Sequence, residues 1–260
     1  MEYQNNLILV EKPAKNVALI TLNNPPLNLV TLELRAELHD TLFKLEQDDE
    51  VRVVVLTGSG KRAFCVGSDV KEFPHVWDDV IGKKLQKENE TFNMIEFLEK
   101  PVIAAMEGNV CGGGYEMAMA CDLRILSNEG RIAQPEINLG VFPGSGGLFR
   151  LPKIVGASKA MEMMFLGEFI EAEDCLRLGL VNRLAPAGEV VPAAIELASQ
   201  IAQKPFEAIK LIKKGVREIG SVPSAECFYR NLEFSKSVFK TADCAEGVDA
   251  FLNKRTPKFG

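Results

Sequence analysis

The sequence predicts an α/β protein with a helical C-terminal third. Short apolar runs rich in β-branched residues recur through the first half, and segments with helical periodicity lie between them. That alternation is typical of βαβ units, in which helices join parallel strands. No linker rich in Pro, Gly or Ser interrupts the chain before residue 150. We therefore expect one continuous α/β core followed by helices.

The first elements are predicted from their local patterns. Residues 7–11 and 17–22 are β-branched runs that we expect to pair as a hairpin across the turn at Pro13–Asn16. Thr31 precedes leucines spaced four residues apart. This spacing predicts an amphipathic helix over 31–47 with Thr31 as its N-cap.

The apolar runs that follow are nearly continuous, as in strands that are covered on both faces. Strands are expected at 51–57, 102–106 and 122–127, with a polar helix near 79–99 and a second helix over 115–121. Further helices are expected at 157–166, 171–177, 188–203, 205–219, 223–238 and 243–253.

Composition limits the classes of function. The 260 residues carry a net charge of −6 and no block of five or more Lys or Arg, which argues against nucleic-acid binding. No apolar stretch approaches the ~18–20 residues of a membrane span, and the N-terminus lacks the pattern of a signal peptide. The six cysteines show no C-x-x-C spacing, so we expect free thiols and a cytoplasmic protein. With only two histidines, neither a metal site nor a Ser-His-Asp triad is expected.

The segment 108–122, GNVCGGGYEMAMACD, places three glycines before an apolar stretch that holds one acid, Glu116. Gly costs about 1 kcal/mol relative to Ala inside a helix, so we expect Gly112, Gly113 and Gly114 to precede a helix and not to build it. Such glycines let a ligand approach the main chain, and the N–H groups at a helix start attract an anion. A tight strand-to-helix turn explains the same glycines equally well. The segment lacks the glycine motifs that bind nucleotides.

Two further segments extend this pattern. Residues 63–71, AFCVGSDVK, form a second glycine turn after an apolar strand. Two such loops can each give one N–H to a shared oxygen, as an oxyanion hole requires. Residues 133–140, AQPEINLG, hold Glu136, and an acid in such a place is ordinarily exposed or paired with a base such as Arg150. A second acid in an apolar setting besides Glu116 nevertheless favours an acid–base pair.

Together these segments resemble the enoyl-CoA hydratase (crotonase) family. The combination of GGGxE with PExxLG about twenty residues later is the most specific part of the resemblance. The matching segments are NNPPLN, AFCVGSDVKEF, KPVIAAMEGNVCGGGYEMAMACD, QPEINLGVFPGSGG, LGLVNRL and AFLNKR. The resemblance implies a spiral of ββα units over 1–195 and a helical trimerisation region over 196–260. It also implies assembly as a homotrimer or a dimer of trimers.

The resemblance implies an acyl-CoA thioester as the ligand, with coenzyme A as part of the substrate and no separate cofactor. It assigns the oxyanion hole to the N–H groups of Ser68 and Gly113, the base that activates water to Glu116, and the acid to Glu136. Ser68 stands where Ala or Gly is common in the family, which leaves its N–H intact. The residues that it places along the substrate are Leu29, Arg62, Val66, Ser68, Asp69, Val70, Lys71, Gly112, Gly113, Phe251 and Lys254.

The implied reaction is the reversible syn addition of water to a 2-enoyl-CoA, which gives a 3-hydroxyacyl-CoA. One alternative is a dehydratase of the carnitinyl-CoA type, which the RLPK run at 150–153 resembles. Another is an isomerase, although isomerases often keep only one acid. A non-catalytic homologue that binds acyl-CoA or RNA, or a structural subunit of a β-oxidation complex, is a further alternative. The bulky Tyr115 and Phe142 are expected either to shape the acyl pocket or to pack.

Overall fold

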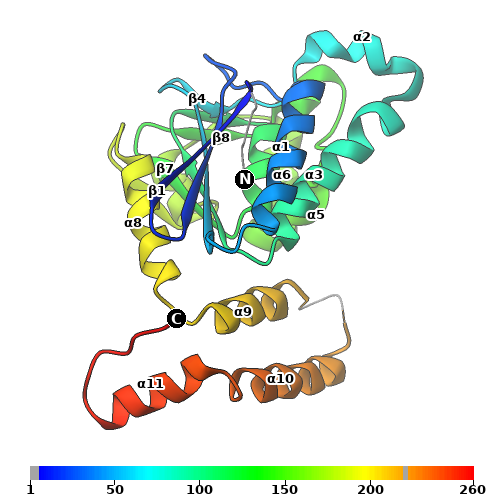
Figure 1. The fold of residues 1–260 in the computed structure, drawn as a ribbon. Coiled ribbons are helices and arrows are strands. Elements are labelled where there is room, and N and C mark those ends of the chain that lie inside the picture. Colours follow the sequence, from blue (N-terminus) through cyan, green and yellow to red (C-terminus); the bar gives the residue numbers. More distant parts are fainter. Residues whose placement is uncertain (1–5, 219–221) are drawn as a thin grey trace.

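The computed structural model describes residues 6–218 and 222–260 (Figure 1). Residues 1–5, at the start of the predicted unit 1–195, and residues 219–221, which include the end of the predicted helix 205–219, lie outside the described ranges. The strands are β1 (Ile8–Ala14), β2 (Val17–Leu22), β3 (Val53–Gly58), β4 (Ala63–Cys65), β5 (Val102–Met106), β6 (Asn109–Cys111), β7 (Leu123–Ser127), β8 (Arg131–Ala133), β9 (Ile170–Glu171) and β10 (Arg183–Ala185). The helices are α1 (Leu32–Glu46), α2 (Phe73–Val76), α3 (Gln86–Phe97), α4 (Gly113–Ala120), α5 (Gly147–Val155), α6 (Ala157–Leu166), α7 (Ala172–Arg177), α8 (Val190–Ala202), α9 (Phe206–Glu218), α10 (Ser224–Val238) and α11 (Ala242–Leu252).

The strands form two sheets, and the predicted α/β class is confirmed. A six-stranded sheet has the order β1-β2-β3-β5-β7-β10, and all its pairs are parallel except β1 with β2. A four-stranded sheet has the order β4-β6-β8-β9. Each long strand of the first sheet from β3 onward is followed by a short strand of the second and then by helical structure. The result is a repeated ββα turn that carries the chain along both sheets.

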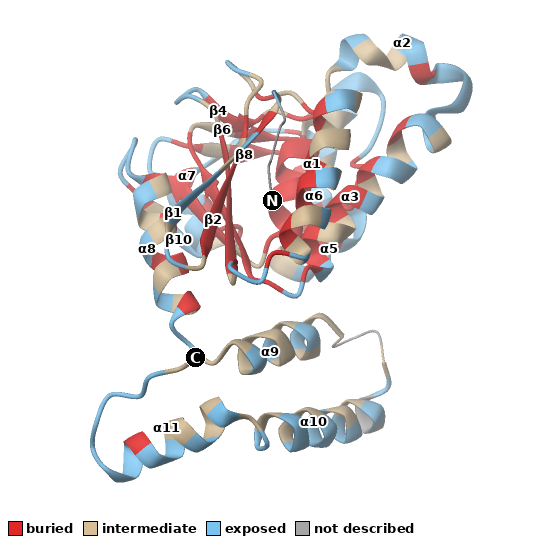
Figure 2. Cartoon of the chain, in the orientation of Figure 1, coloured by how far each residue is buried: buried red, intermediate tan, exposed pale blue. Residues whose placement is uncertain are grey.

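The inner strands of the six-stranded sheet, β2, β3, β5 and β7, are buried on both faces, as their continuous apolar runs predict. Alternate residues of β3 belong to different cores: Val53 and Val55 pack with α8, whereas Val54 and Leu56 pack with the core that includes α1 and α4. Thr31 caps α1, because its hydroxyl accepts a hydrogen bond from the Leu34 N–H at 3.0 Å. Figure 2 shows the buried residues concentrated in the strands of the core, and every residue of α4 is buried as well.

Several sequence-based expectations need correction. Helix α4 begins at Gly113, so Gly113 and Gly114 belong to the helix and do not precede it. The glycine is needed for close packing, because a Cβ on Gly114 would overlap the carbonyl group of Cys65. The short strands β4, β6 and β8 were not predicted, since three residues are too few to show a period. Helix α5 was missed because glycines precede it and Pro152 interrupts its pattern.

The predicted polar helix near 79–99 is not one continuous α-helix. Short helical turns at Trp77–Asp79 and Ile81–Leu85 precede α3, and the second of these has the wider π-type winding. The predicted boundary at 195/196 stays a prediction, and α8 runs across it while packing on the sheet. None of the helices in the described ranges is long and apolar enough to span a membrane.

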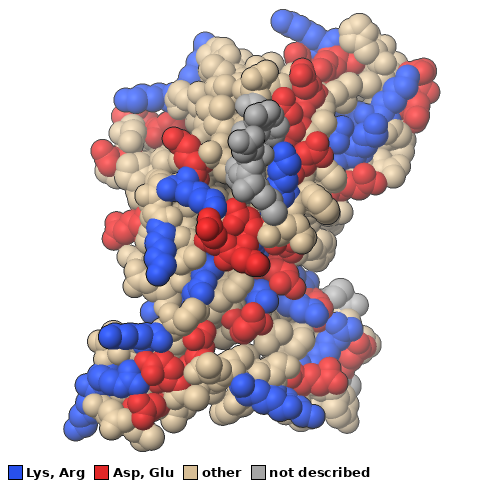
Figure 3. Space-filling view, viewed as in Figure 1, with Lys and Arg blue, Asp and Glu red and all other residues tan. Residues whose placement is uncertain are grey.

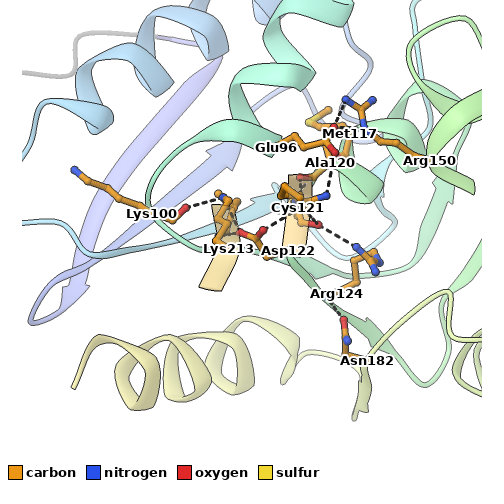
Figure 4. A network of polar contacts seen from close by, with 12 residues as sticks. Glu96, Lys100, Met117, Ala120, Cys121, Asp122, Arg124, Arg150, Asn182 and Lys213 are labelled. Carbon is orange, nitrogen blue, oxygen red and sulfur yellow. Dashed lines mark hydrogen bonds and ion pairs between the residues drawn. The ribbon is translucent and has the colours of Figure 1, made fainter. Parts of the chain in front are cut away.

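Helices α9, α10 and α11, which we call the C-terminal arm, form a separate layer below the core in the view of Figure 1. Helix α9 attaches the arm by ion pairs. The Lys213 ammonium lies 2.8 Å from Asp122 Oδ2 and donates to the Lys100 carbonyl at 3.0 Å (Figure 4). Arg217 contacts Asp122 and also Glu96, whose other carboxylate oxygen pairs with Arg150. On the face shown in Figure 3, acidic side chains gather at the waist between core and arm.

Candidate active site

The first predicted N–H donor lies at the start of α4. Gly112 has a φ of 51°, a conformation that suits glycine, and it turns the chain from β6 into the helix. Its carbonyl oxygen accepts hydrogen bonds from the N–H groups of Tyr115 and Glu116 and from Gln134 Nε2 at 3.1 Å. Because these bonds fix the peptide plane, they also fix the direction of the Gly113 N–H on its other side. Within the described chain no acceptor is bonded to that N–H.

The second predicted donor, the Ser68 N–H, is oriented in the same way. The Gly67 carbonyl, which shares a peptide unit with it, accepts from the Val30 N–H at 2.9 Å, and Asp69 N–H donates to the Val30 carbonyl at 3.2 Å. The Ser68 N–H has no acceptor among the residues that the structure describes. A Cβ on Gly67 would lie 3.3 Å from the Gly113 nitrogen, so the two donor loops are in contact. Two free N–H groups and a helix N-terminus therefore meet at one place, as an oxyanion hole requires.

Glu116 lies one turn into α4 and is 3% exposed. Its Oε1 accepts two main-chain hydrogen bonds, from Ser145 N–H at 2.8 Å and from Gly147 N–H at 2.7 Å. Burial raises the pKa of Glu116 to about 8, although these two donors lower it, and the nearby charges of Glu136 and Glu88 raise it further. Its Oε2 remains available to a water molecule or a substrate.

Glu136 lies on the 3₁₀ helix Pro135–Leu139 that follows β8. Both of its carboxylate oxygens are buried and have no hydrogen-bond partner among the described residues. Its Oε1 would lie 3.2 Å from a Cβ on Gly112, which places the carboxyl group against the first donor loop. Burial raises the pKa of Glu136 to about 7, and the charge of Glu88 adds to that shift. Arg150 pairs with Glu96, so the interpretation of Glu136 as the partner of Arg150 is wrong.

A further acid beside the donor loops, Glu88, is buried as well and was not predicted from the sequence. It lies in α3, 3% exposed, and forms an ion pair with Lys84 one turn earlier. Lys84 Nζ also donates to Ser68 Oγ at 2.9 Å. In the sequence the two residues have the i,i+4 spacing of an ordinary solvated helix pair, so only the packing of α3 against α4 shows that they are buried at the site.

The remaining predicted substrate residues fall into two groups. Val66 and the 68–71 stretch belong to the second donor loop, where Asp69 Oδ1 accepts from the Lys71 N–H at 3.0 Å. Leu29 precedes Val30, which is hydrogen-bonded to that loop, and Arg62 is exposed just before β4. Phe251 and Lys254 lie in α11 and just beyond it, on the C-terminal arm, so this chain does not bring them to the other predicted site residues (Figure 1).

Tyr115 packs in the core and does not line the space between the two acids. It is fully buried, and its hydroxyl donates to the Leu180 carbonyl at 3.3 Å. Phe142, the other bulky residue near the site segments, is largely exposed. Across residues 6–218 and 222–260, no group of three or more His, Cys, Asp or Glu side chains is arranged to hold a metal ion.

The fold is a ββα spiral in which two main-chain donors lie beside the carboxyl groups of Glu116 and Glu136. The enoyl-CoA hydratase/isomerase family matches residues 12–260, and the chain belongs to that family. It is 37% identical over 253 residues to the short-chain-enoyl-CoA hydratase of Clostridium acetobutylicum, with 96% of each chain covered. It is 33% identical to the crotonyl-CoA hydratase of Syntrophomonas wolfei, with 100% of this chain and 99% of the relative covered. The crystal structure of an enoyl-CoA hydratase from Bacillus anthracis superposes with a TM-score of 0.93 at 33% identity, covering 98% of this chain and 99% of the other.

Proposed function

We propose that the protein is an enoyl-CoA hydratase, a hydro-lyase that adds water reversibly to a 2-enoyl-CoA thioester. The observation that carries this proposal is the meeting of two unbonded main-chain donors, Ser68 N–H and Gly113 N–H, with the buried Glu116 and the buried carboxylate oxygens of Glu136. The full-length identity to proteins named as enoyl-CoA hydratases supports the same reaction.

In the proposed mechanism the thioester oxygen accepts hydrogen bonds from Ser68 N–H and Gly113 N–H. Both donors are held rigidly through the carbonyl groups of their own peptide units, so they need no rearrangement when charge develops on that oxygen. The polarised carbonyl draws electrons from the C2–C3 double bond and makes C3 electrophilic. The positive end of the α4 dipole adds to the stabilisation of the enolate.

Proton transfer is assigned to the two acids. Glu116 takes a proton from water as the water oxygen bonds to C3, and Glu136 gives a proton to C2, so the water is added with no net change in the charge of the pair. The pKa values of about 8 and 7 would by themselves place the shared proton on Glu116. We assign the base to Glu116 because its Oε1 already accepts two N–H bonds from other residues, which favour the ionised form, whereas among the described residues only its own main-chain N–H lowers the pKa of Glu136. Neither step calls for a cofactor or a metal.

Binding of coenzyme A is proposed to involve two surfaces. The 68–71 stretch and its neighbours lie at the donor loops, whereas Phe251 and Lys254 lie on the C-terminal arm. A second copy of the chain is therefore proposed to supply Phe251 and Lys254, in a homotrimer or a dimer of trimers. The exposed apolar side chains of the arm support this assembly. Cytoplasmic localisation stays a prediction.

The test is hydration of crotonyl-CoA, followed by the loss of absorbance of the conjugated enoyl thioester. We expect turnover by the wild type and a loss of 10²–10⁴-fold in kcat for Glu116→Gln and for Glu136→Gln, the usual range for removing a general acid or base. Glu90→Gln, on the exposed surface of α3, is the matched control and should keep full activity. A wild type that leaves crotonyl-CoA unchanged but moves the double bond of a 3-enoyl-CoA would contradict the proposal and favour isomerisation.

A further inference from the structure

The ion pair of Lys84 and Glu88 lies at the proposed active site but has no part in the proposed acid–base chemistry. Lys84 is 7% exposed and Glu88 3%. Lys84 Nζ donates to Glu88 Oε2 and, at 2.9 Å, to Ser68 Oγ, and the Ser68 hydroxyl lies 3.5 Å from Glu88 Oε1. The ion pair is therefore hydrogen-bonded to Ser68, whose main-chain N–H is one of the two proposed oxyanion donors.

Glu88 lies against both donor loops and acts electrostatically on both proposed acids. Besides its contact with Ser68, its Oε1 would lie only 3.1 Å from a Cβ on Gly113. Its charge is also among the causes that raise the pKa values of Glu116 and Glu136. Glu88 thus lies beside the space that the thioester carbonyl and the reacting carbons would occupy.

Stability does not explain an ion pair in this place. Taking both charges out of water costs several kcal/mol per ion, and replacing a buried pair with apolar side chains of similar volume is often neutral or stabilising. A pocket for a plain alkyl chain is lined by apolar groups, which an ammonium and a carboxylate are not. The next residue of α3, Asn89, donates to the Leu85 and Gly144 carbonyls at 2.9 Å each and so joins α3 to the loop whose Ser145 and Gly147 N–H groups bind Glu116.

We propose that Lys84 and Glu88 select substrates whose short acyl group carries an uncharged hydrogen-bonding oxygen, such as a hydroxyl, over substrates with a plain alkyl group. The inference rests on the proposed function and names the substrate class of that same site. The Ser68 hydroxyl shows the required pattern, because it accepts from Lys84 and is placed to donate to Glu88. A lysine ammonium has three donors and a carboxylate accepts on two oxygens, so both groups keep capacity for a second hydroxyl.

The charges of the site favour a neutral oxygen over an acyl carboxylate. Three carboxyl groups, those of Glu88, Glu116 and Glu136, act on this space, and Lys84 already neutralises one of them. A further carboxylate on the acyl chain would be repelled by the charges that remain.

The test compares substrates that differ only by a hydroxyl or a methyl group. The pairs are 4-hydroxy-2-butenoyl-CoA with 2-pentenoyl-CoA, and 5-hydroxy-2-pentenoyl-CoA with 2-hexenoyl-CoA. For the wild type we expect kcat/KM to be at least tenfold higher for the hydroxylated member of one pair or both, because a site built to hydrogen-bond a hydroxyl discriminates strongly against its absence.

The double variant Lys84→Met/Glu88→Leu replaces both charged side chains with apolar ones. It is expected to bring the ratio of kcat/KM for the hydroxylated over the methylated substrate to about one or below in each pair. The matched control is Lys83→Met, one residue earlier, whose ammonium pairs with the exposed Asp78. That control should keep the wild-type ratio. Each ratio is measured in one enzyme preparation, so a partly unfolded fraction lowers both rates equally and leaves the ratio unchanged.

Three results would overturn the inference while leaving the proposed function standing. They are a wild-type ratio of one or less in both pairs, an unchanged ratio in the double variant, or faster hydration of glutaconyl-CoA, whose acyl group ends in a carboxylate, than of either hydroxylated thioester. Failure of the wild type to hydrate crotonyl-CoA or any of these thioesters would overturn the proposed function, and the inference with it.

Discussion

The core and the C-terminal arm bury their apolar side chains to very different extents. In the core, β3 and β5 are buried along their whole length, and so is α4. Among the described side chains of the arm, Ala250 is the one buried hydrophobic residue, and large apolar groups such as Phe239 and Phe251 are about four-fifths exposed. Figure 2 shows the same contrast between the two layers.

This difference indicates that the core is complete within one chain and that the arm is not. A groove of about 660 Å³ between α9 and α10 is lined mainly by apolar side chains, including Phe228 and Val238. Contiguous exposed apolar surface of this kind marks an interaction site in a folded protein. The arm nevertheless has a defined position, because Lys213 and Arg217 of α9 pair with acidic groups of the core. The core therefore holds the residues proposed for the chemistry, and the arm is proposed to supply assembly.

The proposed role of the arm in assembly is tested most directly by placing charges on its apolar surface. The double variant Phe228→Asp/Phe239→Asp should dissociate the proposed trimer to monomers, because each side chain would bury a carboxylate in the subunit interface. Light scattering after size-exclusion chromatography measures the assembly state. We expect the KM for the acyl-CoA to rise at least tenfold, since Phe251 and Lys254 of a second copy would be lost. Ser237→Asp, on the same helix, is the control, and wild-type assembly of the double variant would refute the role of the arm.

The pH dependence of kcat/KM tests the core separately from the arm, because both proposed acids lie in the core. With pKa values of about 7 and 8 for Glu136 and Glu116, both acids are protonated below pH 7 and the base is lost. Above pH 8 both are ionised and the acid is lost. The profile should therefore be a bell with its maximum between pH 7 and 8, falling about tenfold per pH unit on either side.

The two limbs of this profile also test the assignment of roles. The residual activity of Glu136→Gln should lose the alkaline limb, because Glu116 then needs only to be ionised and no carboxyl proton donor remains to be lost. The Phe228→Asp/Phe239→Asp variant should keep the wild-type bell at saturating substrate. A maximum near pH 5 would show that neither carboxyl group has a raised pKa.

The smallest expected effect belongs to a residue that lies next to Glu116 in the chain but points into the core. Tyr115→Phe removes one buried hydroxyl and leaves the Leu180 carbonyl without that donor. We expect a loss of about 0.5–1.5 kcal/mol in the free energy of unfolding, the usual contribution of one hydrogen bond, measured by denaturant titration. The kcat/KM for crotonyl-CoA and 2-hexenoyl-CoA should change less than twofold. A tenfold change in the ratio of the two would show that Tyr115 shapes the acyl pocket after all.

The features that local pattern encodes were predicted well. The long strands, the helix capped by Thr31 and the helices of the C-terminal third follow from the periodicity of apolar residues and from capping chemistry. The glycine loops and the two acids stood out because their residue types conflict with their apolar neighbours. The three-residue strands of the second sheet had no such signal, because they are defined by pairing with distant segments.

By itself, then, the sequence determined the fold class, the family and the four residues proposed for the chemistry, because each has a signature within a short stretch of chain. The tertiary structure decided which side chains meet. In the folded chain Ser145 and Gly147 donate their N–H groups to Glu116, and Arg150 forms an ion pair with Glu96. The Tyr115 hydroxyl donates to the Leu180 carbonyl. The tertiary structure also brought Lys84 and Glu88 from a helix that reads as polar surface to the donor loops. The physical reason is that burial and charge pairing depend on contacts between segments far apart in the chain, which no local pattern records.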